Sequence, residues 1–369
     1  MTNRIDISTK NQVNGIFINN NRTLLSFATN SGYRIYSLSS FALLNEEDDD
    51  NDVNATIGAI KIAIPFYQSE LVFLVGKSQT STIKDSQLVI WNDKKKSQFA
   101  MLNFTSFTSQ IAAIAAIRDA IFIAFNNRIE VYETSSLKQI AVINDVCYEA
   151  KNRIEIAFTQ INEPICNVIT ICDIECGNKS NIKINRFLSE KGAITQRCEE
   201  TIPSPFNSIY RIAIDSKGKF ASIIAENDNH VHIYDLLAKK LLYCFDIEKK
   251  YTRINNIGIN ANFVFVFYAD NFLDIYLPKK KKCDCINSKE IAEKIVPFAK
   301  YKFRYRYIDE LVTMNLGSEN NNLFLVYFTK KSEIDLIDAH GICQKIKFNS
   351  KMNDDIWCYK EIKFKNNFY

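Results

Sequence analysis

Cysteine and histidine are the residue types that could hold a metal ion or act as nucleophiles in this chain, which has ten cysteines and three histidines. The most closely spaced cysteines are Cys172 with Cys176 and Cys283 with Cys285. A structural zinc site needs two C-x-x-C knuckles, or histidines at a matching spacing, and neither arrangement occurs. The sequence therefore predicts no metal site and no cofactor.

Catalytic motifs are also missing from the sequence. It has no G-x-S-x-G elbow, no Walker loop and no G-x-G-x-x-G fingerprint, and its ten glycines leave little room for phosphate-cradling loops. The acidic run at residues 46–52 lacks the glycine and the terminal glutamate of a calcium loop, so we expect a solvated loop there. These observations predict that the protein is not an enzyme and has no catalytic residue.

One run of cations stands out, formed by Lys279, Lys280, Lys281 and Lys282. Near an anionic membrane leaflet, each lysine contributes about 1 kcal/mol of attraction at low salt. One interpretation is a loop that adsorbs to membranes by charge, and the alternative is a flexible charged hairpin. Residues 301–307 alternate aromatic with basic side chains, which is typical of a strand with two unlike faces. The net charge of +4 is too small to predict a nucleic-acid partner.

The hydrophobic content of 47% is sufficient for a large core. No apolar run reaches the roughly 18 residues of a membrane span, and the N-terminal residues lack the apolar core of a signal peptide. The longest apolar stretch, residues 111–125, is divided by Arg118 and Asp119 into two strand-length pieces. Without a secretory signal, the cysteines are expected to be reduced, and the protein is expected to be cytoplasmic.

The elements that must position any site are short strands, seen most clearly in residues 208–277. Apolar runs rich in branched and aromatic side chains alternate there with turns containing Asp, Asn, Gly and Lys, which is the signature of strands and hairpins. The first four runs are Ile209–Ile214, Phe220–Ala225, residues 231–234 and residues 241–245. Four strands in roughly 40 residues is the pattern of one propeller blade.

A short signature recurs on the third strand of this pattern. It consists of a variable residue, a branched aliphatic and an aromatic, and it occurs as Arg34-Ile35-Tyr36, Val89-Ile90-Trp91, Glu130-Val131-Tyr132, His232-Ile233-Tyr234 and Asp274-Ile275-Tyr276. Weaker copies are Lys183-Ile184-Asn185 and Asp335-Leu336-Ile337. Seven copies predict an all-β, seven-bladed β-propeller (WD-repeat-like) in a single closed domain. The alternative is a β-sandwich pair whose sequence pattern happens to repeat.

The predicted domain covers residues 1–369. Its blades are expected at residues 13–44, 57–102, 104–143, 154–201, 208–246, 252–277 and 301–348. Residues 356–369 alternate well enough to be a closing strand, and the segment that ends near Pro297 has helical character. In the last blade the predicted strands are residues 301–307, 323–328, 333–337 and 344–348.

Several strings in this sequence resemble the PROPPIN (WIPI-type) propellers. They are L-S-F-A-T-N-S-G-Y-R-I-Y-S at residues 25–37, F-L-V-G at 73–76, Q-L-V-I-W-N-D at 87–93, N-R-I-E-V-Y-E-T-S-S-L-K-Q-I at 127–140, A-I-D-S-K-G-K-F-A-S at 213–222 and V-H-I-Y-D-L-L-A-K-K-L-L-Y-C-F at 231–245. They follow the order of the family, and the resemblance extends from about residue 13 to about residue 348.

The resemblance implies a monomeric scaffold of autophagy or endosomal traffic, peripheral on phagophore, endosomal or vacuolar membranes. Such proteins bind phosphatidylinositol 3-phosphate or 3,5-bisphosphate on the rim of blades five and six, and bind autophagy proteins through other edges. The family's lipid motif is F-R-R-G, and its register here gives Phe245-Asp246-Ile247-Glu248. The supporting Ser, Thr and His positions hold Ala225, Asn229, His232, Tyr268, Phe272 and Asp274.

The loss of both arginines weakens the predicted lipid site, because Arg makes bidentate, charge-assisted bonds to phosphate. Asp246 and Glu248 would repel a phosphate. The candidate substitutes are His230, His232, Lys249, Lys250 and Arg253. The alternatives are that these lysines are ordinary solvated side chains, and that the propeller lost lipid binding and acts only as a protein-interaction platform.

Overall fold

The computed structural model describes residues 13–19, 23–37, 43–48, 57–79, 81–105, 110–144, 154–159, 165–173, 180–190, 193–203, 209–215, 219–225, 230–247, 254–259, 264–268, 272–276, 293–294, 299–302, 310–316, 322–328, 346–347, 355–358 and 362–363. Within these residues every regular element is a β-strand. The described residues include no helix of the length and hydropathy that a bilayer crossing requires.

The strands form antiparallel sheets that follow one another along the chain. The first sheet contains β1 (Val13–Ile18), β2 (Leu24–Thr29), β3 (Gly32–Ser37) and β4 (Leu43–Asp48). The second contains β5 (Ile60–Pro65), β6 (Leu71–Gly76), β7 (Gln87–Asn92) and β8 (Ser97–Asn103). The third contains β9 (Ala113–Ala116), β10 (Ala120–Ala124), β11 (Ile129–Glu133) and β12 (Gln139–Ile143). The fourth contains β13 (Ile154–Thr159), β14 (Ile165–Asp173), β15 (Ser180–Glu190) and β16 (Ala193–Pro203).

The remaining described strands form three more sheets. The fifth contains β17 (Ile209–Ile214), β18 (Phe220–Ala225), β19 (His230–Asp235), β20 (Lys240–Asp246) and β24 (Glu293–Lys294). The sixth contains β21 (Ile254–Ile259), β22 (Val264–Tyr268), β23 (Phe272–Tyr276) and β25 (Ala299–Lys302). The seventh contains β26 (Glu310–Leu316), β27 (Asn322–Phe328), β28 (Ile346–Lys347), β29 (Asp355–Cys358) and β30 (Ile362–Lys363).

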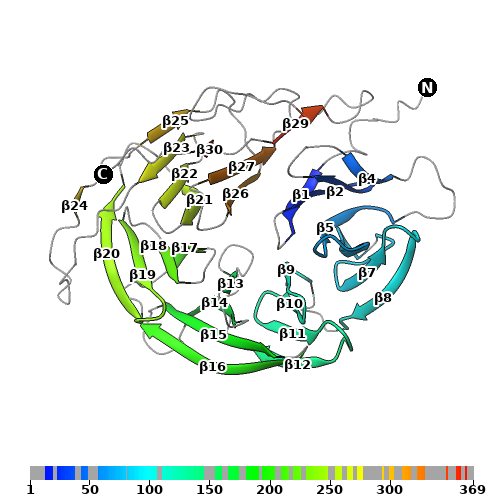
Figure 1. Cartoon of the computed structure of the whole chain (residues 1–369), viewed down its shortest axis with the longest axis horizontal. Coiled ribbons are helices and arrows are strands. Elements are labelled where there is room, and N and C mark those ends of the chain that lie inside the picture. Colours follow the sequence, from blue (N-terminus) through cyan, green and yellow to red (C-terminus); the bar gives the residue numbers. More distant parts are fainter. Residues whose placement is uncertain are drawn as a thin grey trace.

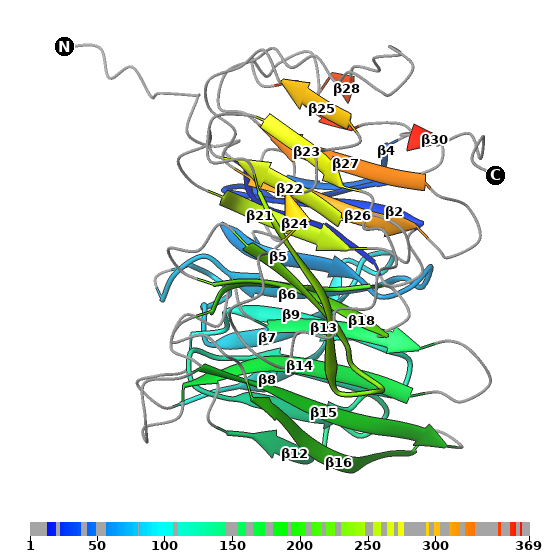
Figure 2. The same ribbon diagram turned by 90° about the vertical axis from the view of Figure 1, so that its left-hand side faces the viewer.

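The sheets are arranged in a ring, with their first strands toward the centre (Figure 1). First strands of neighbouring sheets contact each other at β1 and β5, β5 and β9, β13 and β17, β17 and β21, and β21 and β26. β26 also contacts β1, so the last sheet meets the first. Seen from the side, the sheets lie one above another like blades (Figure 2). The fold is therefore a β-propeller, as the sequence predicts.

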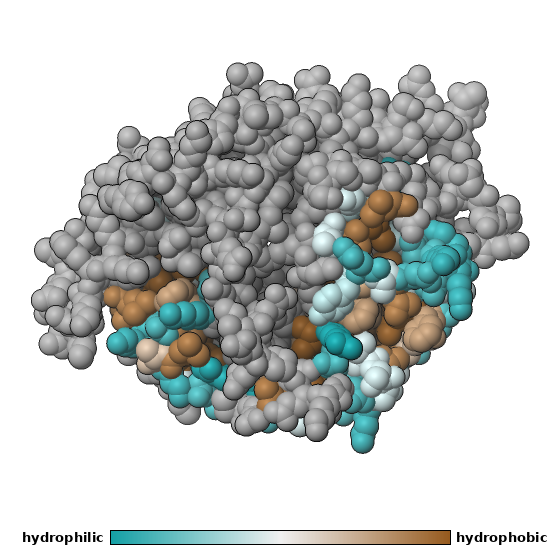
Figure 3. All heavy atoms as spheres, in the orientation of Figure 1, coloured by the Kyte–Doolittle hydropathy of each residue, from teal (hydrophilic) through white to brown (hydrophobic). Residues whose placement is uncertain are grey.

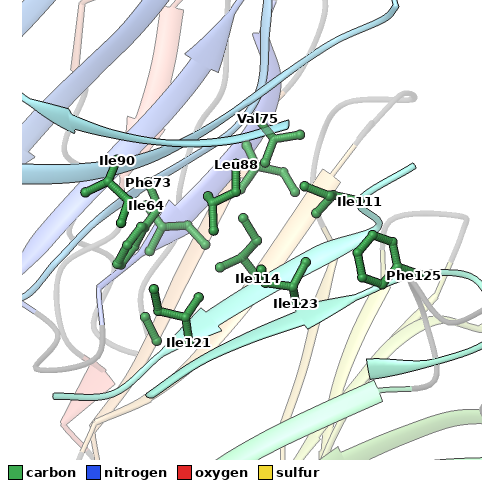
Figure 4. Packing of buried hydrophobic residues seen from close by; sticks show 12 residues of the cluster. Ile64, Phe73, Val75, Leu88, Ile90, Ile111, Ile114, Ile121, Ile123 and Phe125 are labelled. Atoms are coloured by element: carbon green, nitrogen blue, oxygen red, sulfur yellow. The ribbon is translucent and has the colours of Figure 1, made fainter. Parts of the chain in front are cut away.

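The core consists of apolar clusters between neighbouring sheets. Side chains of a strand alternate between two faces, so each blade contributes to the cluster on either side of it. Figure 4 shows the cluster between the second and third sheets, where Phe73 and Ile90 of one blade meet Ile114 and Ile123 of the next. Apolar side chains also reach the surface over the sheet β5–β8 (Figure 3), where Phe99 of β8 is 69% exposed.

The recurring triplet occupies the third strand of its sheet in every copy that the described residues include: β3, β7, β11, β15, β19 and β23. In four of these sheets the ladder to the fourth strand shifts by one residue directly before the aromatic residue, namely before Tyr36, Trp91, Tyr132 and Tyr234. A bulge at this point increases the local twist of the sheet. In these four sheets the triplet therefore marks a β-bulge as well as a strand.

Three sequence expectations differ from the structure. Residues 301–307 were assigned to the seventh blade, but Tyr301 lies in β25, which pairs with β23 of the sixth sheet. The segment before Pro297 was expected to be helical, but Glu293–Lys294 forms β24. The acidic run at residues 46–52 was expected to be a loop, but Glu46 lies in β4, opposite Arg34. In each case long-range pairing decides the conformation, which local composition does not record.

The last two described strands pair within the seventh sheet. β29 and β30 both pair with β27, so part of the tail at residues 356–369 joins the last sheet. The triplet Asp335-Leu336-Ile337 lies outside the described residues. The split of residues 111–125 is confirmed, since β9 and β10 flank Arg118 and Asp119.

Candidate functional site

The two candidate histidines lie at the start of β19. Their ring centroids are 6.1 Å apart. His232 is 8% exposed, and His230 is intermediate in exposure. His232 is on the same face of β19 as Tyr234, which packs in a cluster with the fourth sheet. The histidine pair therefore faces the fourth sheet.

Two residues at the family's lipid motif, Phe245 and Ile247, face the other way. Phe245 is fully buried and Ile247 is 3% exposed, and both pack in the apolar cluster between the fifth and sixth sheets. The ring of Phe245 lies 4.9 Å from the ring of Tyr276. At the position of the second arginine, the chain thus places an aliphatic side chain in the core. The histidines and the pair Phe245 and Ile247 thus lie on opposite sides of the sheet, whereas Asp246 is the cross-strand partner of His230.

The sixth sheet contributes a buried carboxyl group next to the apolar cluster between the fifth and sixth sheets. Asp274 has no exposed surface, and its Oδ2 accepts a 3.3 Å hydrogen bond from the hydroxyl of Tyr276. The hydroxyls of Tyr268 and Tyr276 are also 3.3 Å apart. A carboxyl group buried within an apolar cluster offers a phosphate group no compensating cation. Ala225 is the last residue of β18, and Phe272 is the first residue of β23. Asn229 lies outside the described residues.

The outer edge of β20 is covered by a strand that the sequence did not predict. β24 pairs in parallel with β20, with Glu293 opposite Phe245 and Lys294 opposite Asp246. The segment between β23 and β24 contains residues 279–282, and the segment between β20 and β21 contains Lys249, Lys250 and Arg253. These seven basic residues lie outside the described residues. The strands that flank both segments all belong to the fifth and sixth sheets.

A metal centre is not present among the described residues, where no three His, Cys, Asp or Glu side chains gather as ligands. Cys244, the cross-strand partner of His232, forms no disulfide and is of intermediate exposure. Cys176, Cys283 and Cys285 lie outside the described part of the chain.

Comparison with known proteins gives matches only at the level of structure. No family profile and no curated protein matches the sequence. The structure of Kluyveromyces marxianus Hsv2 is similar, with a TM-score of 0.64, 12% identity, and coverage of 96% of this chain and 99% of that one. The structure of KlAtg21 with the coiled coil of AgAtg16 gives 0.63, 15% identity, and the same coverage. Kluyveromyces lactis Hsv2 gives 0.62 at 12% identity, again over 96% and 99%.

These similarities show that the chain shares the propeller fold of Hsv2 and Atg21, which are PROPPINs. The resemblance seen in the sequence is thereby confirmed as a fold relationship across 96% of the chain.

Proposed function

We propose that this chain is a non-enzymatic, PROPPIN-like scaffold of autophagy or endosomal membrane traffic. It is cytoplasmic and monomeric, and it is recruited peripherally to phagophore, endosomal or vacuolar membranes that contain phosphatidylinositol 3-phosphate or 3,5-bisphosphate. The observation that carries this proposal is the pairing of β24 with β20, which anchors the end of the lysine-bearing segment on the rim of the fifth sheet.

Recruitment is electrostatic in this proposal. The arginine positions hold Asp246 and the buried Ile247, so a fitted headgroup pocket between the fifth and sixth sheets is disfavoured. The basic residues Lys249, Lys250, Arg253 and residues 279–282 follow strands of these two sheets in the sequence. Four lysines at an anionic surface supply attraction on the order of 4 kcal/mol at low salt. We therefore expect membrane binding to follow total lipid charge more than the phosphate isomer.

Protein partners are the second part of the proposal. KlAtg21 was solved in complex with the coiled coil of AgAtg16. A helical partner of the autophagy type is accordingly proposed for this propeller, bound at edges other than the fifth and sixth rims.

Liposome flotation with phosphatidylinositol 3-phosphate tests the membrane part. Changing Lys279, Lys280, Lys281 and Lys282 to Ala should reduce flotation and flatten its salt dependence. Changing Lys249, Lys250 and Arg253 to Glu should do the same. The matched control changes the exposed residues Lys84, Lys94, Lys95 and Lys138 to Ala, which removes the same charge from other blades.

The alternative function is a platform that binds proteins only. Two observations between the fifth and sixth sheets favour this platform function: the burial of Ile247 and the buried carboxyl group of Asp274. Absence of flotation at moderate salt would support this alternative and reject membrane recruitment. Equal flotation of the wild type and both rim variants would instead reject the proposed rim site.

A further inference from the structure

An open pocket of about 570 Å³, lined by both polar and apolar surface, lies between the first and second sheets. These two sheets lie across the ring from β20 (Figure 1). Its lining includes Asn30, Gly58, Lys77, Ser78, Ser81 and Thr82. These residues come from the turn between β2 and β3, the segment before β5 and the loop after β6. The volume is in the range of small-molecule sites, about 300–1,000 Å³.

The backbone around the pocket depends on two glycines. A Cβ atom on Gly76 would lie 1.5 Å from the carbonyl oxygen of Ile83, so only glycine lets the loop after β6 fold back this closely. Gly58 has a φ of +74°, and a Cβ atom there would lie 3.1 Å from Thr82 Oγ1. Glycine at these two positions therefore allows the segment before β5 and the loop after β6 to pack closely around the pocket.

Lys77 supplies a cation to this pocket. Its Nζ donates a 2.8 Å hydrogen bond to Asn30 Oδ1, and its backbone N–H donates to the carbonyl of Ala59 at 3.0 Å. Other lysines, such as Lys94 and Lys183, form ion pairs with glutamates. Among the described residues no carboxylate forms an ion pair with the Lys77 ammonium, whose hydrogen bond goes to the neutral amide of Asn30.

The remaining polar lining consists of hydroxyl groups. Ser78 and Ser81 have their Oγ atoms 3.2 Å apart, and the backbone N–H of Ser78 donates to Ser81 Oγ at 3.3 Å. The described residues that line the pocket include no carboxylate. The nearby Asp85 is 3% exposed and accepts a hydrogen bond from the amide of Gln79. Hydroxyl donors around one ammonium match the needs of a tetrahedral oxyanion.

We infer that this pocket binds a phosphate group, either free inorganic phosphate or the phosphate of a lipid headgroup. The site is separate from the rim of the fifth and sixth sheets and does not depend on the proposed membrane recruitment. Lys77 provides the charge, and the hydroxyls of Ser78, Ser81 and Thr82 provide orientation.

Calorimetric titration of the full chain with inorganic phosphate, at constant ionic strength, tests the inference. Lys77→Ala should weaken binding by about 10-fold or more, because it removes a charge-assisted hydrogen bond. Ser81→Ala should weaken it less, and the exposed Lys95→Ala should leave it unchanged. No heat with the wild type, an equal response to chloride, or equal affinity in Lys77→Ala and Lys95→Ala would overturn the site. Melting curves establish that each variant is folded.

Flotation with phosphatidylinositol 3-phosphate vesicles then identifies the source of the phosphate. Reduced flotation of Lys77→Ala assigns the pocket to the headgroup, whereas unchanged flotation with weakened phosphate binding assigns it to a soluble phosphate. The variant with residues 279–282 changed to Ala should keep its phosphate affinity. Failure of the rim proposal can thus be told apart from failure of this one.

Discussion

The hydroxyl of Tyr33 in β3 donates a 2.5 Å hydrogen bond to Oδ1 of Asp93, the residue that follows β7. Tyr33 has no exposed surface and Asp93 is 3% exposed, so this bond links the first and second sheets inside the core. The same Asp93 oxygen lies 3.1 Å from Nζ of Lys96. A short polar link thus fixes one blade against the next within otherwise apolar packing.

Replacing Tyr33 with Phe should lower the free energy of unfolding by about 1–3 kcal/mol, because it removes a buried bond to a charged acceptor. Urea unfolding of Tyr33→Phe, Asp93→Ala and the double variant measures the coupling of the pair. Strictly additive effects would show that the bond does not contribute.

Replacing Ile247 with Arg should destabilise the protein by about 3 kcal/mol or more, since it places an unpaired charge in an apolar cluster. Ile247→Val is the matched control and should cost about 0.5–1.5 kcal/mol. Thermal unfolding compares the two. If Ile247→Arg were as stable as the wild type and floated better with vesicles, the motif position would be an accessible headgroup site after all.

Tyr234 should make the protein sensitive to alkali. Burial raises the pKa of Tyr234 to about 12 from the usual 10.0. A folded-state pKa above the unfolded value means that its contribution is complete below pH 10 and is lost as pH rises toward 12. Tyr234→Phe should therefore lose less stability than the wild type between these values. Parallel melting curves from pH 9 to pH 12 check this, and identical slopes would contradict it.

Glu200 should make the stability of the protein fall in acid, whereas Tyr234 makes it fall in alkali. The pKa of Glu200 is lowered, chiefly by the hydrogen bond from Lys239, whose Nζ is 2.9 Å from Oε1, and also by Arg186. Its contribution is present above the usual value of 4.5 and is lost as pH falls through the lower folded-state pKa. The stability advantage of the wild type over Glu200→Gln should shrink in acid. An advantage that is constant from pH 7 to pH 3 would contradict this assignment.

Lys96 adopts a left-handed backbone conformation, with a φ of 49°, in the turn between β7 and β8. Leu137 and Lys239 do the same in the corresponding turns of the third and fifth sheets. Lys96→Gly and Lys96→Ala both remove the ion pair to Asp93, but only Gly relieves the backbone. The Gly variant should be more stable than the Ala variant by about 1 kcal/mol in urea unfolding. Equal stability would show that the turn carries no strain.

Much of the fold could be predicted because one short pattern repeats. The triplet with Tyr36, Trp91, Tyr132 or Tyr234 combines strand alternation with an aromatic at a bulge, and both are local features. β24 could not be predicted, because two residues in a parallel ladder have no period. β25 was assigned to the wrong blade because a long insert separates it from β23.

The candidate site was less predictable than the fold. The sequence shows that His232 and Ile233 point to opposite faces of β19, but not which neighbouring sheet each face meets. That depends on the order of blades around the ring. Likewise, the register Phe245-Asp246-Ile247 was visible in the sequence, but the burial of Ile247 against the sixth sheet was not. The pocket at Lys77 combines three separate segments, and no single motif announces it.

The strand pairing at β24 also affects how this protein meets other chains. An outermost strand presents unpaired N–H and C=O groups, on which an extended peptide or a misfolded neighbour can build. Among the described strands, β8 is the unpaired outer strand of its sheet, and its own residue Phe99 is exposed. The outer edge of β20 is instead paired with β24 of the same chain, at Phe245 and Asp246. Intermolecular strand addition is thus blocked at this point of the fifth blade, whereas no described strand covers the outer edge of β8.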